Sequence, residues 1–326
     1  MANLALRNPQ FKSIAIPSSG VLSTVCTVTI DGTLRYTLVK NVQPSTTINF
    51  DIAELARDYI EITYQTNYIP QTVLIVTVLT NKAGLNGTGA NVGSATTITD
   101  KGFEAYGTFE EGVNPNVPFR GVPSYLMSKS NSTEFTILAP SGLSGRLPSI
   151  TSLNGLIATN YSTTDTIKTV EGNVCNIKRI DCTKYGNGNK ITFINKYGAQ
   201  QDLFFFLKKT RSLARTNEGY KSNTITYPSG GATYSVQDAP NKVFNTQAKQ
   251  THTFSSGYYP EFANEQFEEL LLSEFIWWST FKKGSGVVIP LKVKTSSMAF
   301  KTSVNDRLIE YTIEFEEAFD YINNIR

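Results

Sequence analysis

The sequence has very little of the chemistry that enzymes use. It contains one histidine, His252, whose neighbours mark neither a nucleophile nor an orienting acid. A Ser/His/Asp or Cys/His site would have to use this residue, so nucleophilic catalysis is not expected. Because His252 lies in the alternating segment 250–254, we expect a strand there, with the imidazole ring pointing outward.

Cysteine is also scarce, with residues only at positions 26, 175 and 182. Six residues separate Cys175 from Cys182, and no second pair exists, which excludes the usual zinc-ligand spacing. The odd number and wide placement argue against a disulfide framework. We expect reduced cysteines that serve as small buried hydrophobic side chains.

Nucleotide-binding motifs and long apolar runs are absent from the sequence. Gly84, Gly87 and Gly89 resemble a phosphate loop only in composition, because no Lys-Ser pair follows them. We therefore expect no cofactor. No window of about 18 apolar residues predicts a membrane span, and the first residues do not resemble a secretory signal. The expected protein is made in a cytoplasm and carries no cleaved leader.

Charge is sparse and nearly balanced. Charged residues make up 17% of the chain, with 30 Lys and Arg against 27 Asp and Glu. This excess is too small to predict nucleic-acid binding, which calls for a concentrated basic face. The carboxylate pairs Glu110-Glu111, Glu268-Glu269 and Glu316-Glu317 offer glycosidase chemistry in principle. Adjacent acids on a strand point apart, so we expect no enzyme.

Tyr, Phe, Ser, Thr, Asn and Gly are abundant, and this mixture favours β-structure with polar loops. The predicted fold is mainly β, with two antiparallel β-sandwich-like domains and a few short helices. At 326 residues the chain is long enough for two domains. We place them at residues 1–145 and 146–326, with the boundary in the Pro/Gly-rich stretch 139–150.

In the first half, Val21–Val39 predicts a hairpin around the turn signal Asp31-Gly32. Ile48–Ile60 predicts a short helix with Asp51 as N-cap and Glu54 as its capping-box partner. Thr72–Thr80 is almost entirely apolar or β-branched, which predicts a central strand. Residues 81–123 then form a long irregular stretch, either an assembly contact or a surface excursion.

In the second half, the turn-rich stretch 184–189 predicts a hairpin between strands at 174–179 and 190–195. Three consecutive phenylalanines predict that the strand 202–208 is covered on both faces. The C-terminal fifth predicts a helix over Phe267–Trp278, followed by strands at 287–294, 298–303 and 308–319. Ile309, Tyr311, Ile313 and Phe315 fall on one face of the last strand. If it pairs with 287–294, its outward glutamates face Lys292 and Lys294.

Four segments carry a family resemblance: Asn49–Ile60, Gly107–Pro115, Phe193–Lys209 and the tail Phe267–Phe319. Together they resemble uncharacterised virion structural proteins of tailed bacteriophages, especially those of marine and Bacteroidetes hosts. The resemblance covers most of the chain, and its motifs are structural. It implies a tail, tail-tip, baseplate or neck component, made in the host cytoplasm and located in the virion. The implied partners are other virion proteins and further copies in a ring.

A ring suggests where subunits meet, because each copy offers one surface to a different surface of the next. The segment 196–221 carries six basic residues against two acidic ones, and 261–274 carries five glutamates and no basic residue. We predict that a basic loop at 208–221 contacts an acidic surface of a neighbour. The predicted contact residues are Lys208, Lys209, Arg211 and Arg215. Alternatively, both segments are solvated, or they meet within one subunit.

Two other functions remain open from the sequence. The first is a receptor- or carbohydrate-binding β-sandwich, with Trp277, Trp278 and Tyr258-Tyr259 as a stacking platform for sugar rings. Against it, the tryptophans lie in the predicted helix among apolar neighbours, where they are expected to pack in a core. The second is a cell-wall hydrolase, which requires a cleft with an acid pair.

Overall fold

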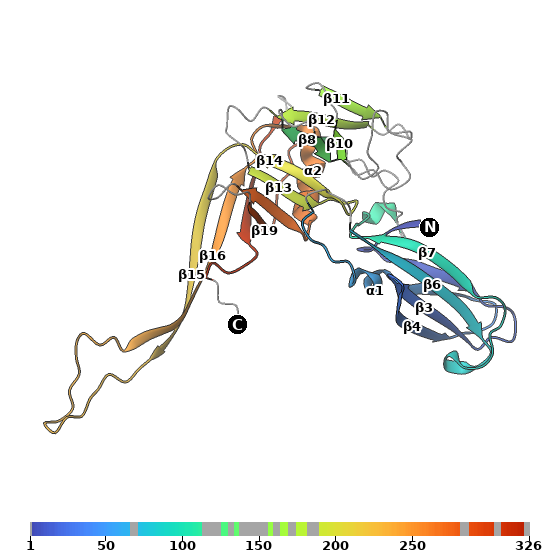
Figure 1. The fold of residues 1–326 in the computed structure, drawn as a ribbon, viewed down its shortest axis with the longest axis horizontal. Coiled ribbons are helices and arrows are strands. Elements are labelled where there is room, and N and C mark those ends of the chain that lie inside the picture. The colour runs from blue at the N-terminus through green and yellow to red at the C-terminus, as the bar shows by residue number, and fades with distance from the viewer. Residues whose placement is uncertain are drawn as a thin grey trace.

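The computed structural model describes residues 2–65, 71–112, 189–280, 287–302 and 308–322, together with five strands between residues 125 and 180 (Figure 1). The fold is mainly β with sandwich-like packing, as predicted. The described ranges contain two α-helices, α1 (Ala53–Arg57) and α2 (Asn264–Leu272).

The N-terminal sheet has five strands in the order β1-β7-β6-β3-β4. Their bounds are β1 Ala2–Ala5, β3 Ser23–Ile30, β4 Thr33–Asn41, β6 Thr72–Lys82 and β7 Thr96–Phe103. The predicted hairpin is confirmed: β3 and β4 pair around Asp31 (φ 47°) and Gly32 (φ 80°), the positive φ values of a type I′ turn. The predicted central strand is also confirmed, because β6 lies between β7 and β3.

A second layer covers the inner face of this sheet. It consists of α1 and the pair β2 (Phe11–Ala15) and β5 (Thr47–Asp51). Cys26, Val28 and Ile75 from the sheet pack with Phe50 and Ile52 from the second layer. The prediction of a buried cysteine is confirmed for Cys26, and burial raises the pKa of its thiol to about 11.

Two predictions for the N-terminal half are wrong. Only Ala53–Arg57 is helical within 48–60, and Ile52 rather than Asp51 precedes the helix as N-cap. Thr47–Asp51 is strand β5, whose end Asp51 accepts hydrogen bonds from the backbone N–H of Gln10 (2.9 Å) and of Ala53 (3.1 Å). The stretch 81–123 is not irregular throughout, because it contains β7.

The C-terminal sheet has seven strands in the order β14-β13-β18-β19-β21-β16-β15. Their bounds are β13 Asn189–Ile194, β14 Gln200–Phe205, β15 Lys209–Lys221, β16 Asn241–Ser255, β18 Ile276–Thr280, β19 Val287–Val293 and β21 Thr312–Glu317. Helix α2 packs Phe267 and Leu270 into its core, and the short strands β17 (Tyr259–Pro260) and β20 (Leu308–Ile309) pair beside it. Phe204 and Phe205 are both buried, as the prediction for this strand required.

The predicted single strand 308–319 is divided into β20, which pairs with β17, and β21, which joins the seven-stranded sheet, but the predicted burial pattern is confirmed. Ile309, Tyr311, Ile313 and Phe315 are all buried on one face. Strand β21 pairs with β19, which places Lys292 opposite Glu316, and Lys294 Nζ lies 3.1 Å from Glu314 Oε1.

Three other predictions for this half are wrong. Trp277 and Trp278 lie on strand β18 rather than on a helix. The described residues 298–302 form no strand. The hairpin predicted between 174–179 and 190–195 does not form, because β13 pairs with β14 and β18 instead.

The remaining strands form two small sheets, β11-β12-β8 and β10-β9. Their bounds are β8 Tyr125–Lys129, β9 Glu134–Thr136, β10 Leu156–Ala158, β11 Thr164–Lys168 and β12 Val174–Ile180. The predicted domain boundary, residues 139–150, lies outside the described residues. The division into 1–145 and 146–326 therefore stays a prediction.

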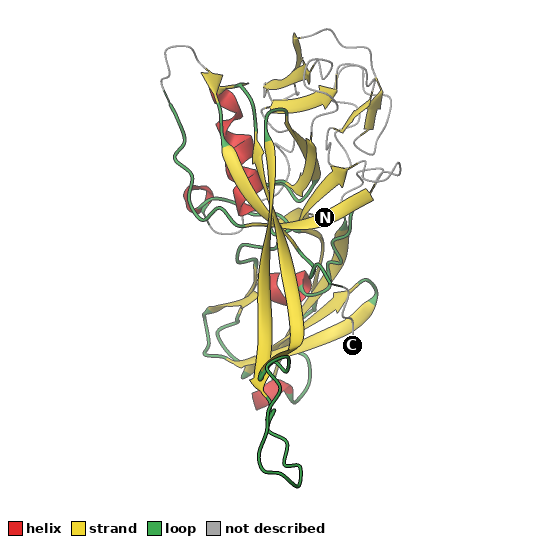
Figure 2. Cartoon of the chain, turned by 90° about the vertical axis from the view of Figure 1, so that its left-hand side faces the viewer, coloured by secondary structure: helices red, strands yellow, loops and turns green. Residues whose placement is uncertain are grey.

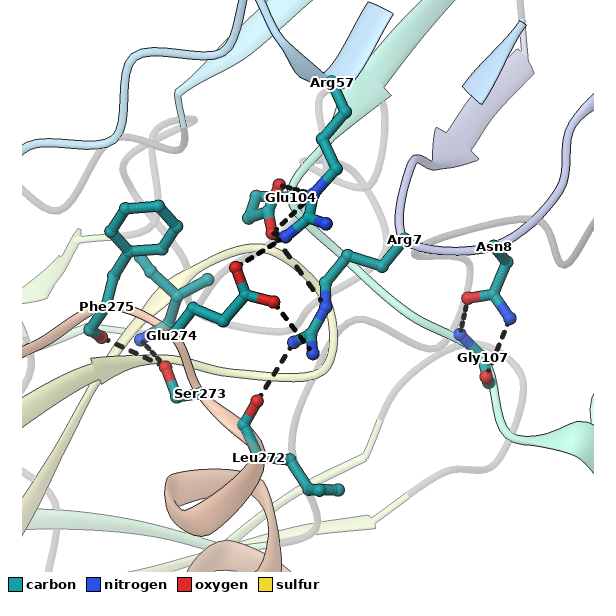
Figure 3. A network of polar contacts seen from close by, with 10 residues as sticks. Arg7, Asn8, Arg57, Glu104, Gly107, Leu272, Ser273, Glu274 and Phe275 are labelled. Carbon is teal, nitrogen blue, oxygen red and sulfur yellow. Dashed lines mark hydrogen bonds and ion pairs between the residues drawn. The ribbon is translucent and has the colours of Figure 1, made fainter. Parts of the chain in front are cut away.

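The N-terminal sandwich and the seven-stranded sheet meet through an ion-pair cluster (Figure 3). Arg57 from α1 contacts Glu104, just beyond β7, and Glu274, just beyond α2, each at 2.6 Å. Arg7 lies 3.3 Å from Glu274 and donates a hydrogen bond to the carbonyl oxygen of Leu272. Glu104 is the most buried member, because its side chain is only 5% exposed. We call these four charged residues the junction cluster.

Candidate assembly surfaces

The most prominent surface feature is a hairpin arm formed by β15 and β16 (Figure 1, Figure 2). The two strands pair from Lys209↔Phe254 to Lys221↔Asn241. At its base, β16 also pairs with β21 over Thr251–Ser255, and the backbone N–H of Tyr321 reaches the carbonyl oxygen of Ala248. Beyond that point, no other described strand pairs with the two, and the ribbon points away from the rest of the subunit.

The outer part of the arm is uncovered, whereas its base on β16 is buried. Every residue of β15 from Thr210 to Lys221 is exposed. Apolar side chains are among them, with Leu213 and Tyr220 each 51% exposed, and Phe244 on β16 is 66% exposed. An isolated two-stranded hairpin is at best marginally stable in water. The arm therefore has the properties of an element that is completed by another surface.

The tip of the arm has one apolar side. Thr226 and Thr233 form an antiparallel bridge, and their hydroxyls lie 3.2 Å apart on one side of it. Ile225, Tyr227 and Tyr234 flank this bridge, and we expect their side chains on the opposite side, because neighbouring residues alternate along an extended chain. They are 46%, 76% and 72% exposed. Asp238 is the only charged residue in 222–240. We call Ile225, Tyr227 and Tyr234 the tip face.

The four predicted contact residues lie at the base of the arm, on or next to a strand rather than in a loop. Lys209, Arg211 and Arg215 share one face of β15, because they are spaced by two or four residues. Lys209 Nζ lies 3.4 Å from the centre of the Trp278 ring, and Arg211 stacks over Tyr321 at 5.7 Å. Lys208 and Arg215 are exposed. Two of the four thus pack on aromatic rings of their own subunit, and the proposed contact with a neighbour stays a prediction.

The predicted acidic segment is partly used within the chain. Glu274 belongs to the junction cluster, and Glu269 is buried with the backbone N–H of Lys196 3.3 Å from its Oε2. This arrangement matches, in part, the alternative that basic and acidic segments meet within one subunit. Glu265 and Glu268 remain exposed.

The prediction of an outward-pointing His252 is wrong. Its side chain is fully buried beneath the base of the arm, with Nε2 2.8 Å from Glu317 Oε1 and 2.7 Å from Gln250 Nε2. The reason is the sheet: β16 turns this face toward the core, where the His252 ring lies 4.8 Å from that of Trp278. The expectation that adjacent acids on a strand point apart is confirmed for this pair. Glu317 points into the core, and Glu316 points to the opposite side of the sheet, where it pairs with Lys249.

The residues considered for sugar stacking are mostly in the core. Trp278 and Tyr259 are each 1% exposed and Trp277 is 8% exposed, whereas Tyr258 is 66% exposed. Core packing of the tryptophans is therefore confirmed, although on a strand. Among the residues that the structure describes, no cluster of His, Cys, Asp and Glu could hold a metal ion, and no helix could span a membrane.

Comparison with family models, with curated proteins and with solved structures finds no match to this chain. The fold alone places it among mainly β proteins, and its distinguishing feature is the projecting arm.

Proposed function

We propose that the chain is a structural component of a tailed-phage virion, as a tail, tail-tip, baseplate or neck protein that assembles into a ring. The sequence resemblance supports the virion, and the arm supports assembly through protein–protein contacts. The arm is the observation that carries the proposal, because its ribbon leaves its own subunit with exposed apolar side chains on it.

The outer arm exposes apolar side chains that its own subunit does not cover. Contiguous exposed apolar surface on a folded protein marks an interaction site. Beyond its pairing with β21, the ribbon points away from its own body, which therefore does not cover it (Figure 1). A neighbouring subunit supplies the missing surface. In a ring of copies arranged head to tail, every arm meets such a neighbour.

Truncation of the arm tests the proposal. In this variant, Asn-Gly replaces residues 217–246, so that a two-residue turn joins the paired residues Thr216 and Gln247. We expect a folded monomer that does not assemble, because the base of the arm keeps its contacts with β21. Sedimentation velocity of the purified protein measures assembly, and complementation of a phage lacking the gene measures tail formation. Normal rings and infectious particles from the truncated chain would contradict the proposal.

Charge reversal tests the predicted contact at the base of the arm. We choose Lys208→Glu with Arg215→Glu, because Lys209 and Arg211 pack on rings of their own subunit. The double variant is expected to assemble at least tenfold more weakly in low salt, with the difference shrinking as salt is added. The matched control is Lys301→Glu, at another exposed position. Equal assembly of the double variant and the control at every salt concentration places the contact elsewhere.

A further inference from the structure

A second uncharged surface lies on the N-terminal sheet, on the side opposite its core. Along β6, the buried residues Val73, Ile75, Thr77 and Leu79 alternate with Leu74, Val76, Val78 and Thr80. The second set points away from the core and is exposed or half-buried. A strand in a sheet with one solvated face normally carries polar or charged residues there. Here three of the four outward residues are aliphatic.

The neighbouring strands continue this character. Opposite Thr80, Val78 and Val76, strand β3 places Val25, Thr27 and Thr29. The next strand, β4, adds Val39, Thr37 and Leu34, and β7 adds Thr97 and Thr99. None of these residues is charged, and the charged neighbours Lys82 and Lys101 lie at the two ends of β6. We call this set, with the outward residues of β6, the outer face.

The outer face is exposed to solvent at several aliphatic side chains. Leu34 is 59% exposed, Val39 is 42% exposed and Leu74 is 40% exposed. Apolar residues gathered on one face, with charges only at the rim, are typical of an interaction site rather than of scattered surface side chains.

We propose that the tip face of one copy docks on the outer face of the next copy. This inference rests on the proposed ring assembly and names its contact. Neither surface contains a charged residue, and both expose aliphatic or aromatic side chains, although the turn at Gly87 packs on Val25 and Val39 at one end of the outer face. Bringing the two surfaces together removes apolar area from water and leaves no charge unpaired. Neither the tip face nor the outer face offers a charged group to a nucleic acid or an acidic partner.

The geometry makes the contact intermolecular. The arm and the N-terminal sheet project from different sides of the molecule, with the tip far from β3, β4 and β6 (Figure 1). The two surfaces are also different from each other, so the contact is head-to-tail and can repeat from copy to copy. Each subunit then has one donor tip and one receptor sheet.

A mixing experiment tests the contact. One variant carries Tyr227→Asp and Tyr234→Asp on the tip face, and the other carries Val76→Lys and Val78→Lys on the outer face. Each alone is expected to remain a folded monomer. An equimolar mixture retains one intact tip and one intact sheet, so it should form a heterodimer and stop there. Sedimentation velocity gives the size, and circular dichroism confirms the fold. The matched control is Thr233→Lys, on the opposite side of the tip, which should assemble like the unmodified chain.

The outcomes separate this contact from the proposed function. If the Val76/Val78 variant is folded and assembles normally while the arm truncation does not, the arm binds another surface and the docking proposal is wrong. If the truncated chain also assembles, the arm-based proposed function fails as well. If the unmodified chain stays monomeric at every concentration, the proposal that a second copy binds the outer face is wrong. If the double variant Val76→Lys, Val78→Lys does not fold, the single variant Val78→Lys, at the centre of the outer face, replaces it. Normal assembly of that folded single variant in sedimentation velocity would contradict the docking proposal.

Discussion

Glu104→Ala is expected to lower the free energy of unfolding by about 1.5–3 kcal/mol, the usual range for losing hydrogen bonds to a charged group. Glu104 accepts hydrogen bonds from Arg57 Nε at 3.1 and 3.0 Å and from Arg57 Nη2 at 2.6 Å. Its oxygen also lies 4.0 Å from Arg7 Nε. Without this carboxylate, Glu274 is the one counter-charge that pairs with the two guanidinium groups among the described residues. Denaturant unfolding of the purified chain measures the loss.

The matched control is Glu274→Ala in the same junction cluster. The side chain of Glu274 is 49% exposed, so water and salt screen its ion pairs. Its removal is expected to cost at most about 1 kcal/mol, as for surface pairs. Equal losses for the two variants would contradict the assignment of Glu104 as the residue that holds the junction.

The second large effect concerns Glu269 on α2 and appears as a pH dependence. Burial, followed by the nearby Glu265 charge, raises the pKa of Glu269 from 4.5 to about 8. The folded state therefore holds a proton that the unfolded chain releases above about pH 4.5. Stability from this group falls as pH rises from about 4.5 through about 8, because ionisation places an unfavourable charge in the core.

Glu269→Gln removes this titration while keeping a similar shape. We expect the variant and the unmodified chain to be about equally stable near pH 4, and the variant to be more stable by a few kcal/mol at pH 9. Thermal or denaturant unfolding across that range measures the difference. The control is Glu54→Gln, at an exposed position on α1, which should leave the fall in stability between about pH 4.5 and 8 in place. A constant difference between Glu269→Gln and the unmodified chain at all pH values would rule out the buried carboxyl as its source.

Local patterns predicted the elements whose residues have a strong intrinsic signal. Asp31-Gly32 supplies the positive φ values that its turn requires, and the alternation from Ile309 to Phe315 matches burial on one face. Both signals are local, so no knowledge of partners is needed. The mainly β class followed from the same kind of evidence in composition.

The failures came where tertiary pairing decided the structure. The spacing of Phe267, Leu270 and Leu271 indicates a helix, and α2 does form there, but it ends at Leu272. Trp277 and Trp278 then join β18 because strands β13 and β19 lie on either side of it. Glu274 and Trp278 continue the helical spacing by chance, so the sequence pattern does not reveal that the helix ends at Leu272 and that a strand begins at Ile276.

Strand β7 was missed because its sequence looks like a loop. It contains Asp100 and Gly102 among threonines. Asp100 is buried beside Lys12, and Gly102 is closely packed, since a Cβ there would lie 2.6 Å from Leu6 Cδ1 and displace that side chain. Both reasons depend on residues far away in the chain, which a local pattern cannot supply.

The candidate surface was only partly predictable. The surplus of basic residues at 208–221 singled out a segment whose contact with a neighbour stays a prediction, and charge count alone could not place it on a strand or stack Lys209 on Trp278. The sequence does not predict the tip face, because Ile225, Tyr227 and Tyr234 come together only when Thr226 pairs with Thr233. The sequence offers one indication of this pairing: Thr226 and Thr233 flank a short stretch rich in Gly and Ser that can form a turn.

The continuity of β16 also determines how the protein responds to tension. The strand runs from Asn241 in the arm to Ser255 in the core, where Thr251–Ser255 pair with β21. A pull on the tip is directed along the strand, so it loads these hydrogen bonds together, in shear, instead of opening them one by one. The register shift at Glu218/Gly219 interrupts the ladder farther out. Under load, we expect the ribbon to open beyond this bulge first, while the part paired with β21 stays in place.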